Sequence, residues 1–553
     1  MAKPTRFTQE MMDRYFTKGY WNKMRPSDYW ERNSIRYPEK EAFVDQHKRV
    51  TWAQAKKYAD RLALGLLELG FKKDDVILMQ LPNCVESYLV RCACEEAGVL
   101  CATIQMNPRE AEILSLAKRT KATGVVIQHK NRGRDYFATM ANVQREVASM
   151  RIFVTGEDVP AGAHSIEQMM ERPIENEYPP NRLDETRFDV TEVAVLGTTS
   201  GTTGEPKIVE HTIAARAAMG DFYGRIVGGL TDEDIIGVIG SCIMGGAAAL
   251  SYSGGAAAVG AKTVLLETWD AEEAFKLIEK ERTSVIFAVP TQLIMMLKHP
   301  NIDRYNFSSL RAIFHATSTL PYEAAEGLER KVQAKLISSY GTFDGGVITA
   351  QTMDDPPEIR WGTVGRCAFG NELKLVREDG KEAAQGEMGE VVFRGACTCS
   401  GFYKDMDATL QTWGELGEGG WFKTGDLAVL DEHQYVSLVG RMKEVIIRGG
   451  QNVYPQNIES MLITHPKVAQ VAIIGMPDPV MGERVCAYIA TKPGQQFSFE
   501  EMISFLKEHE VASYNLPERL EIRSELPTGD LGKVMKPRLK EDLLSKMQAE
   551  GKK

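Results

Sequence analysis

The ten residues from Thr198 to Lys207, TTSGTTGEPK, combine four threonines, one serine, two glycines and a terminal lysine. Glycine lets backbone N–H groups turn toward an anion because no Cβ blocks the approach, and a nearby lysine adds positive charge. The stretch therefore predicts a phosphate-binding loop, with an ordinary Gly- and Thr-rich surface loop as the alternative. Glu205 and Pro206 separate Gly204 from the lysine, so the order differs from the G-x-x-x-x-G-K-[ST] loop of NTPases and a GTPase-type site loses its main support.

Short β-branched runs and amphipathic stretches alternate on both sides of this loop. The predicted strands are 76–80, 99–104, 124–128, 151–154, 193–196, 285–289 and 310–314, and the predicted helices include 52–69 and 271–281. This alternation indicates βαβ units and an α/β fold with mostly parallel sheets. Ligands of open α/β sheets bind beyond the carboxyl ends of the strands, so a phosphate loop directly after the 193–196 strand is in the expected place.

The pattern of predicted secondary structure changes after about residue 365. Short strands interrupted by glycine, at 371–376, 390–394 and 427–430, predict a small antiparallel or distorted barrel-like subdomain over residues 366–440. Strands near 471–474 and 485–489 predict a small α+β unit in residues 441–553. We therefore expect a large domain over residues 1–440 and a smaller one after it.

Composition narrows the possible partners and the compartment. A chain of 553 residues exceeds what one hydrophobic core usually organises, and its net charge of −10 argues against binding nucleic acid through phosphate neutralisation. The closest cysteine pairs, Cys92/Cys94 and Cys397/Cys399, have one residue between them and fit neither a zinc knuckle nor a secreted disulfide framework. The N-terminal residues lack the apolar core of a signal peptide. These features favour a cytoplasmic protein with a small ligand.

Residues 235–261 carry no charge, which on length alone would suggest a membrane span. The segment also contains seven glycines and three serines. We therefore predict a tightly packed buried segment and no membrane span, because glycine and alanine permit close backbone approach.

Four later segments bear on the phosphate site. Residues 340–344 (YGTFD) place a carboxylate just past a predicted strand end, where Mg²⁺ bound to phosphates needs an oxygen ligand. Residues 421–426 (WFKTGD) place a second carboxylate, which is suited to accept hydrogen bonds from the hydroxyls of a ribose. Gly440-Arg441 adds a guanidinium, and residues 526–533 (LPTGDLGK) end in a lysine. Taken singly, a Gly-Asp or Gly-Lys pair favours a turn, and a lone arginine favours a surface salt bridge.

In this order and spacing, these segments resemble the acyl-adenylate-forming enzymes, which include acyl-CoA synthetases, adenylation domains of peptide synthetases and firefly luciferase. The resemblance runs from about residue 30 to 540. It implies a large N-terminal domain joined at a hinge to a mobile C-terminal domain, with ATP, Mg²⁺ and coenzyme A as cofactors and a small carboxylic acid as substrate.

The resemblance also implies a role for individual residues. The ATP and AMP site would comprise Thr198, Thr199, Ser200, Gly201, Thr202, Thr203, Gly204, Lys207, Ser339, Tyr340, Gly341, Thr342, Phe343, Asp426, Arg441 and Lys533. Within it Asp426 would hold the ribose, Asp344 the metal, and Lys533, Thr199 and Asp344 would be catalytic. The acyl pocket would be formed by Ser241, Cys242, Gly245, Gly246, Ala316, Thr317, Ser318 and Phe343. Gly449 and Gly450 would border the coenzyme A tunnel, and Lys443 would be the hinge.

The chain departs from the family pattern at three places. The family usually has Tyr-Gly-x-Thr-Glu where this chain has Phe343 and Asp344, and a Gly-Gly-Ala strip where it has residues 316–318 (ATS). Many relatives also carry a histidine or an aromatic gate near residues 240–244, and this chain has neither. The nearby His211 and His315 are expected to be ordinary polar neighbours and not bases.

Small residues along 245–247 and the ring of Phe343 favour an aromatic or alicyclic monocarboxylate, as do details reminiscent of stand-alone aryl-acid ligases. Only 20 residues follow Lys533, so the acceptor must be a separate molecule. Free coenzyme A is the first expectation and a phosphopantetheinyl carrier protein the second. A catalytically impaired nucleotide- and acyl-binding protein is the alternative from another class, and both a monomer and a homodimer remain open.

The role of Lys533 can be tested directly. Its ammonium would offset the negative charge that builds up as a carboxylate oxygen attacks the α-phosphorus of ATP. Lys533→Ala should therefore slow acyl-AMP formation by orders of magnitude and affect ATP binding less. Thioester formation from supplied acyl-AMP should suffer less, because the family moves this lysine away between the two steps. Acyl-AMP formation at a near wild-type rate would show that the assigned role is wrong.

Overall fold

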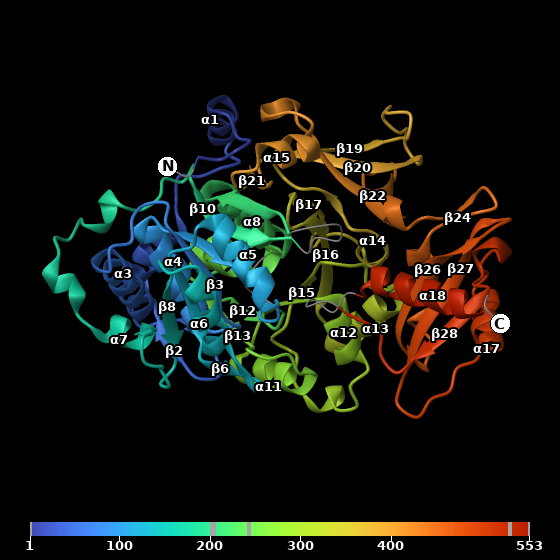
Figure 1. The fold of residues 1–553 in the computed structure, drawn as a ribbon, viewed down its shortest axis with the longest axis horizontal. Helices are drawn as coiled ribbons and strands as arrows, with labels where there is room; N and C mark the ends of the chain where they lie inside the picture. The colour runs from blue at the N-terminus through green and yellow to red at the C-terminus, as the bar shows by residue number, and fades with distance from the viewer. Residues whose placement is uncertain (1–2, 200–205, 241–244, 529–533, 551–553) are drawn as a thin grey trace.

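The structure of the protein is a computed structural model that describes residues 3–199, 206–240, 245–528 and 534–550 (Figure 1). One large sheet has eight strands in the order β21-β11-β10-β4-β3-β5-β8-β9. Its central strands, β10, β4, β3, β5 and β8, are parallel to one another, and β11 pairs antiparallel with β10. The bounds are β3 (Val76–Gln80), β4 (Leu100–Thr103), β5 (Gly124–Gln128), β8 (Arg151–Thr155), β9 (His164–Ser165), β10 (Val193–Thr198), β11 (Ile208–Thr212) and β21 (Gly401–Phe402). The predicted parallel sheet is confirmed.

A second sheet has nine strands in the order β18-β17-β16-β15-β14-β12-β13-β1-β2. The strands from β1 through β13, β12, β14 and β15 to β16 are parallel, and β17 folds back antiparallel against β16. The bounds are β1 (Glu41–Val44), β2 (Arg49–Thr51), β12 (Ile235–Val238), β13 (Lys262–Leu265), β14 (Val285–Ala288), β15 (Ala312–His315), β16 (Lys335–Thr342), β17 (Gly346–Ala350) and β18 (Arg366–Cys367).

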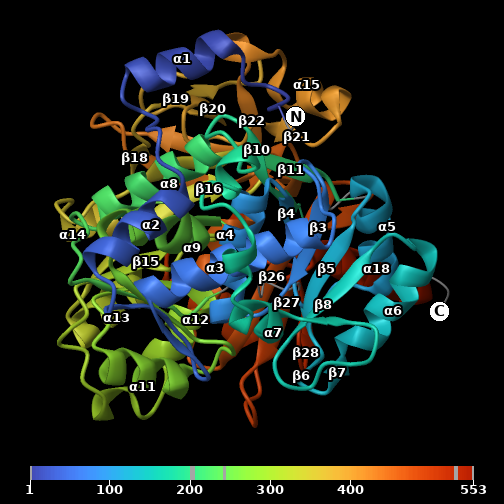
Figure 2. The same cartoon turned by 90° about the vertical axis from the view of Figure 1, so that its left-hand side faces the viewer.

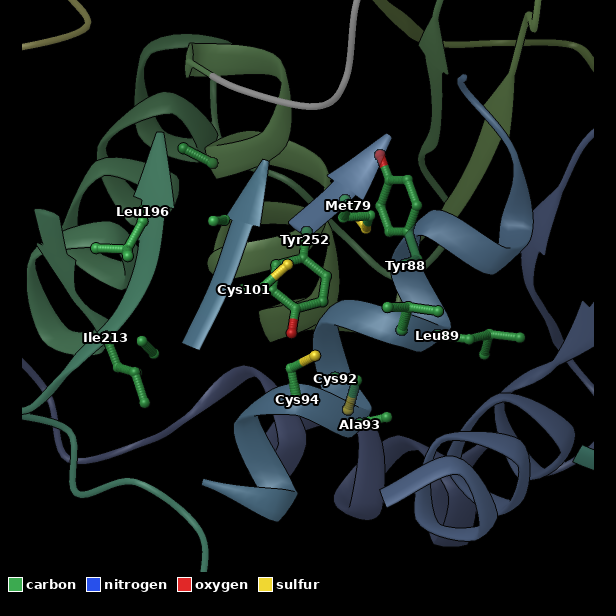
Figure 3. Close-up of a cluster of buried hydrophobic side chains, with 14 of the residues drawn as sticks. Met79, Tyr88, Leu89, Cys92, Ala93, Cys94, Cys101, Leu196, Ile213 and Tyr252 are labelled. Carbon is green, nitrogen blue, oxygen red and sulfur yellow. The ribbon is translucent and has the colours of Figure 1, made fainter. Parts of the chain in front are cut away.

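Helices fill the connections between the parallel strands. Helix α3 (Trp52–Glu68) begins at a capping box in which Thr51 and Gln54 exchange hydrogen bonds. Every residue of α4 (Val85–Ala97) is buried, and Figure 3 shows its side chains packed against β4 and Tyr252. Helices α8 (Ile213–Ile226), α11 (Ala271–Glu281), α12 (Pro290–Leu297) and α13 (Tyr322–Val332) follow.

The uncharged segment 235–261 is broken into short elements and does not form one long helix. It contributes β12, α9 (Gly245–Ala248), the helical turn η3 (Ala249–Ser253) and α10 (Gly255–Val259), whose described side chains are largely buried. The prediction of a buried segment is thus confirmed. Among the residues that the structure describes, no helix is long and apolar enough to cross a membrane.

Two smaller sheets follow the large ones. Four antiparallel strands run in the order β19-β20-β22-β23, with β19 (Asn371–Val376), β20 (Met388–Gly395), β22 (Phe422–Leu430) and β23 (Val436–Arg441). The last sheet combines β24 (Ile446–Arg448), β25 (Gln451–Val453), β26 (Val468–Asp478), β27 (Gly482–Thr491) and β28 (Arg519–Arg523). Helices α16 (Pro455–Leu462), α17 (Phe499–Glu508) and α18 (Lys536–Glu550) accompany it, and Figures 1 and 2 show this unit beside the large sheets. The chain is therefore a large α/β part with a small C-terminal α/β part, as predicted.

An ion-pair cluster joins the edge of the nine-stranded sheet to α11. Oxygens of the Glu281 carboxylate lie 2.9 Å from Nη1 of Arg49 in β2 and 2.9 Å from Nζ of Lys262 in β13. The Glu281 side chain is only 8% exposed. Its hydrogen bonds with Arg49 and Lys262 lower its pKa from 4.5 to about 2 despite the opposing effect of burial.

This cluster predicts how stability depends on pH. A carboxylate whose pKa is depressed in the folded state stabilises the protein above its unfolded pKa, and that stability is lost as pH falls toward the folded pKa. Relative to wild type, Glu281→Gln should lose about 2–3 kcal/mol of unfolding free energy at pH 7. This difference should shrink as pH falls from 4.5 toward 2, and chemical denaturation over that range measures it. Glu323→Gln, on the exposed face of α13, is the matched control; an equal loss at every pH would contradict the prediction.

Candidate active site

The predicted phosphate loop is closed at its base by two strands. The backbone N–H of Thr199 donates to the carbonyl of Lys207 at 3.1 Å, and the N–H of Lys207 donates to Oγ1 of Thr199 at 3.3 Å. Thr198, the last residue of β10, pairs with Ile208 of β11. Ser200, Gly201, Thr202, Thr203 and Gly204 lie outside the described residues. The loop therefore starts and ends at adjacent backbone positions at the carboxyl end of a central parallel strand.

The Lys207 side chain is directed toward a neighbouring helix. Its ammonium donates to Oγ1 of Thr412 at 3.1 Å and lies 4.5 Å from the ring centroid of Phe402. Thr412 belongs to α15 (Met406–Trp413), and Phe402 to the edge strand β21. Lys207 thus connects the base of the loop to helix α15 and to the edge strand β21.

Asp426 lies at the point where two sheets meet. Its Oδ2 accepts a hydrogen bond from the Tyr340 hydroxyl at 2.6 Å, and its Oδ1 lies 2.9 Å from Nε of Arg441. Tyr340 belongs to β16, whereas Asp426 and Arg441 are paired across β22 and β23. Burial and the Asp426 carboxylate raise the pKa of Tyr340 well above its ordinary value. Three residues that were predicted from separate motifs are therefore in direct contact.

The local sequence also orients this carboxylate. The backbone N–H of Asp426 donates to Oγ1 of Thr424 at 3.0 Å, and that hydroxyl donates to the carbonyl of Val391 at 2.8 Å. Asp426 is 5% exposed. Sequence reasoning missed Thr424, although Ser or Thr two residues before an aspartate is a common local turn that could have indicated it.

The β16–β17 hairpin places the next predicted residues. A Cβ on Gly341 would lie 2.5 Å from the carbonyl oxygen of Gly346, so this crossing requires glycine. Oγ1 of Thr342 is buried and has no hydrogen-bond partner within the described part of the chain. Phe343 and Asp344 occupy the turn, and Ser339 is buried on the strand before it. A buried hydroxyl without a protein partner is what a site for a polar ligand provides.

Asp344 was predicted as the metal ligand. It is half-buried, and its carbonyl oxygen accepts from Sγ of Cys399 at 2.7 Å. Over the described ranges, no group of three or more His, Cys, Asp or Glu side chains forms a potential metal site. A single carboxylate fits Mg²⁺, which proteins often hold by one or two carboxylates together with substrate phosphates. Asp344 therefore remains a candidate metal ligand.

Residues 316–318, called here the acyl strip because they are predicted to line the acyl pocket, directly follow β15 and contain a strained residue. Thr317 adopts a φ of +87°, a left-handed conformation that β-branched residues rarely occupy. It stands between half-buried Ala316 and exposed Ser318. The next residue, Thr319, accepts a hydrogen bond through Oγ1 from Nε2 of Gln456 at 2.9 Å. Because Gln456 lies in α16, this contact joins the small C-terminal part to the acyl strip.

Aromatic side chains lie beside Gly246 and Phe343. A Cβ on Gly246 would lie 3.0 Å from the ring of Tyr223, whose centroid is 4.8 Å from that of Phe314. The rings of His211 and Phe343 meet edge to face at 5.6 Å. Gly245 begins α9, and Ser241 and Cys242 lie outside the described residues. Sequence reasoning missed Tyr223, because no motif marks its position on α8.

Both nearby histidines are buried. Burial lowers the pKa of His315 to about 4 and that of His211 well below its ordinary value, so both rings are neutral at physiological pH. Within the described residues, neither ring nitrogen of His211 has a hydrogen-bond partner. His211 is therefore a buried, neutral polar ring beside Phe343.

Gly449 and Gly450 form the turn between β24 and β25, with φ values of +55° and +82° that suit glycine. Lys443 lies in the short helical turn η6 (Met442–Glu444), directly after β23 and before β24. Lys533 lies outside the described residues. The loop that carries it is closed by pairing of Thr528 with Val534.

Lys536, three residues after Lys533, was not predicted from the sequence. Its ammonium lies 2.7 Å from Oε2 of Glu444, next to the predicted hinge, and 2.8 Å from Oε1 of Glu459 in α16. These ion pairs tie the base of the lysine loop to the connection between the two parts of the chain.

The chain matches the family of AMP-binding enzymes over residues 30–403, and the C-terminal domain of AMP-binding enzymes over residues 457–533. It belongs to the AMP-binding enzyme family. The putative acyl-CoA synthetase YngI of Bacillus subtilis is 29% identical, with 92% of this chain and 95% of that protein covered. The medium-chain fatty-acid–CoA ligase of Escherichia coli is 27% identical, with 98% and 94% covered.

Solved structures share the fold of this AMP-binding enzyme. The anthranilate CoA ligase AuaEII, in complex with anthranoyl-AMP, superposes with a TM-score of 0.85 at 22% identity, with 95% of this chain and 98% of that chain covered. The o-succinylbenzoate CoA synthetase MenE from Bacillus subtilis superposes with a TM-score of 0.78 at 22% identity, with 93% and 97% covered. The resemblance inferred from the sequence is confirmed: the protein is an AMP-forming ligase of the acyl-CoA synthetase branch, and ATP is its nucleotide.

The left-handed backbone of Thr317 in this AMP-binding enzyme predicts the effect of a substitution at that residue. A non-glycine residue at positive φ costs about 1–3 kcal/mol, and glycine relieves this strain at a smaller entropic cost. Thr317→Gly should therefore stabilise the protein by about 1 kcal/mol. Ser318→Gly, at a neighbouring position without positive φ, is the matched control and should be destabilising. Melting temperatures of the three proteins test this, and a lower value for Thr317→Gly than for wild type would contradict it.

Proposed function

We propose that the protein is an ATP-dependent carboxylic acid:CoA ligase that forms an acyl adenylate and then an acyl-CoA thioester. The observation that carries this proposal is the contact of Asp426 with Tyr340 and Arg441, which joins three residues that the resemblance assigns to the nucleotide site. Its carboxylate has further lone pairs with which to accept hydrogen bonds from the ribose hydroxyls of ATP. Relatives named as CoA ligases match almost the whole chain, which supports coenzyme A as the acceptor.

The proposed chemistry has two steps. First, a carboxylate oxygen forms a bond to the α-phosphorus, the bond from that phosphorus to the bridging oxygen breaks, and pyrophosphate leaves. The thiol of coenzyme A then loses its proton to solvent, its sulfur forms a bond to the acyl carbonyl carbon, and AMP leaves with the electron pair of the broken carbon–oxygen bond. No covalent bond to the protein forms in either step, so its residues act by positioning and by electrostatic stabilisation.

Individual residues would divide this work. Residues 198–204 with Lys207 would hold the leaving pyrophosphate, and Lys533 would neutralise charge at the attacking oxygen and the α-phosphate. Mg²⁺, held by Asp344 and phosphate oxygens, would neutralise the negative charge of the nucleotide. The hydroxyl of Thr342, which has no hydrogen-bond partner in the described part of the chain, would bind a polar group of the nucleotide.

We further infer that residues 1–440 and 441–553 act as two domains that turn about Lys443 between the steps. The short turn η6 supports this, because it is the connection between the last strand of the four-stranded sheet and the first strand of the C-terminal sheet. In the second step Gly449 and Gly450 would border the path of the thiol. The eight described cysteines are all free, which fits the reducing cytoplasm in which we place the enzyme.

An aromatic or alicyclic monocarboxylate is the proposed acid. Tyr223, Phe314, Phe343 and His211 supply rings around the small residues of the pocket, and flat apolar walls suit a cyclic substrate. Two relatives of the same fold act, by their names, on anthranilate and o-succinylbenzoate. The second candidate is a medium-chain fatty acid, favoured by the names of several sequence relatives.

A panel of aromatic, alicyclic and medium-chain aliphatic acids tests this proposal. We expect acid-dependent pyrophosphate release with the highest kcat/KM for a ring acid, and thioester formation only when coenzyme A is added. Asp426→Ala, which lacks the proposed ribose ligand, provides the background rate. Pyrophosphate release with aliphatic acids alone would contradict the proposal of a ring acid and favour the second candidate, a medium-chain fatty acid.

Two further outcomes concern the acceptor and the activity itself. Adenylate formation without any thioester on coenzyme A would favour a phosphopantetheinyl carrier protein as the acceptor. The absence of acid-dependent release across the whole panel would contradict the ligase function and favour a nucleotide- and acyl-binding protein without turnover.

A further inference from the structure

The start of the chain packs against the strand that follows the phosphate loop. The family match begins at residue 30, so the residues before it lie outside that match. Within them, the backbone N–H of Thr5 donates at 2.5 Å to Oε1 of Glu210 in β11. The N–H of Arg6 donates at 2.8 Å to the carbonyl of Ser400, just before β21. Figure 2 shows this end of the chain beside β21 and α15. The N-terminal residues are therefore bound at the edge of the eight-stranded sheet, next to the strand that begins after Lys207.

Arg6 is a buried cation with a defined set of partners. It is 1% exposed, and its Nη2 donates to Oγ1 of Thr398 at 2.5 Å and to the carbonyl of Cys399 at 3.0 Å. Burial lowers the pKa of Arg6 to about 10, so its guanidinium stays charged at neutral pH. The guanidinium lies 3.7 Å from the ring centroid of Trp413, which is a close cation–π contact. Because a buried cation is costly unless it is bound, these contacts fix Arg6 and Trp413 against each other.

Trp413 connects Arg6 to a lysine assigned to the phosphates. It is the last residue of α15 and is 1% exposed, and the residue before it, Thr412, accepts through Oγ1 a hydrogen bond from the Lys207 ammonium at 3.1 Å. An ammonium has three N–H donors, so the bond to Thr412 leaves two of them for phosphate oxygens. The contacts of Arg6 thus reach Lys207 through two consecutive residues of one helix.

The N-terminal residues bind both elements between which Lys207 is held. Thr5 contacts β11, the strand directly after Lys207, and Arg6 contacts the end of α15, which binds the ammonium. Lysine has a flexible four-carbon stem, and ordering that stem before a ligand arrives reduces the entropy lost on binding. A fixed distance between β11 and α15 would therefore favour the binding of phosphate by Lys207.

We propose that Arg6 is a positioning residue for the nucleotide site, which fixes the end of α15 so that Thr412 holds the Lys207 ammonium ready for the phosphates of ATP. The inference rests on the proposed role of Lys207 and adds that a segment outside the family match sets its position. Arg6 acts through Trp413 and does not contact the nucleotide. It should therefore affect the affinity for ATP.

Calorimetric titration of the full-length protein with ATP and Mg²⁺, in the absence of any acid, tests this proposal. Arg6→Met removes the cation but keeps a long side chain, and it should weaken ATP binding by roughly three- to tenfold. Arg6→Lys keeps a cation near Trp413 and should recover most of this loss. Arg145→Met, the same change on the exposed surface of α6 (Tyr136–Glu146), is the matched control and should bind ATP like wild type.

A double-mutant cycle separates positioning from a general loss of stability. Lys207→Ala should weaken ATP binding more than Arg6→Met does. Adding Arg6→Met to Lys207→Ala should cause no further loss, because the group that Arg6 positions is then absent. If Arg6→Met does not fold, Thr412→Val takes its place in the cycle, since it removes only the hydroxyl that binds Lys207, and the same lack of additivity is expected.

Three outcomes would overturn the proposal. They are wild-type affinity for ATP in both Arg6→Met and Thr412→Val, the same loss from Arg6→Met with and without the Lys207 side chain, and unchanged affinity in Lys207→Ala. The absence of acid-dependent pyrophosphate release would contradict only the proposed ligase function, because the titrations require neither an acid nor turnover.

Discussion

The contact of the Asp426 carboxylate with Tyr340 and Arg441 is the interaction around which the site is assembled. It joins the end of a strand in the nine-stranded sheet to two strands of the four-stranded antiparallel sheet. A carboxylate that is 5% exposed is stable only where charged and hydroxyl groups bind it. This carboxylate therefore links the two sheets directly, at the place where we propose that the nucleotide binds.

The segments proposed to carry the chemistry are anchored to this frame at their bases. The phosphate loop leaves and rejoins adjacent strands at Thr199 and Lys207, and the lysine loop is closed between Thr528 and Val534. Lys536 ties the second loop to the connection between the two parts through Glu444. The Gln456–Thr319 contact shows that the C-terminal part also reaches the acyl strip.

Much of the fold was predictable because its signals are local. The predicted strands 76–80, 124–128 and 371–376 and the helix 271–281 have the same bounds in the structure. Gly341 was predicted as a nucleotide-site residue, and this role stays a prediction; the structure shows a separate steric reason for glycine in the β16–β17 hairpin. Tyr223 and Lys536 were missed because each contacts partners distant in the chain, which no local periodicity or motif marks. Thr424 was missed although a local turn with Asp426 could have indicated it.

The sequence by itself determined the family, the α/β class and the order of the chemical motifs, because strand runs, glycine positions and motif spacing are recorded in neighbouring residues. Only the tertiary structure decided that Asp426 meets Tyr340, 86 residues away. It alone revealed the left-handed backbone of Thr317, and it alone placed Arg6 over the ring of Trp413. Such features depend on which side chains are desolvated together, and desolvation is set by packing between segments that are remote in sequence.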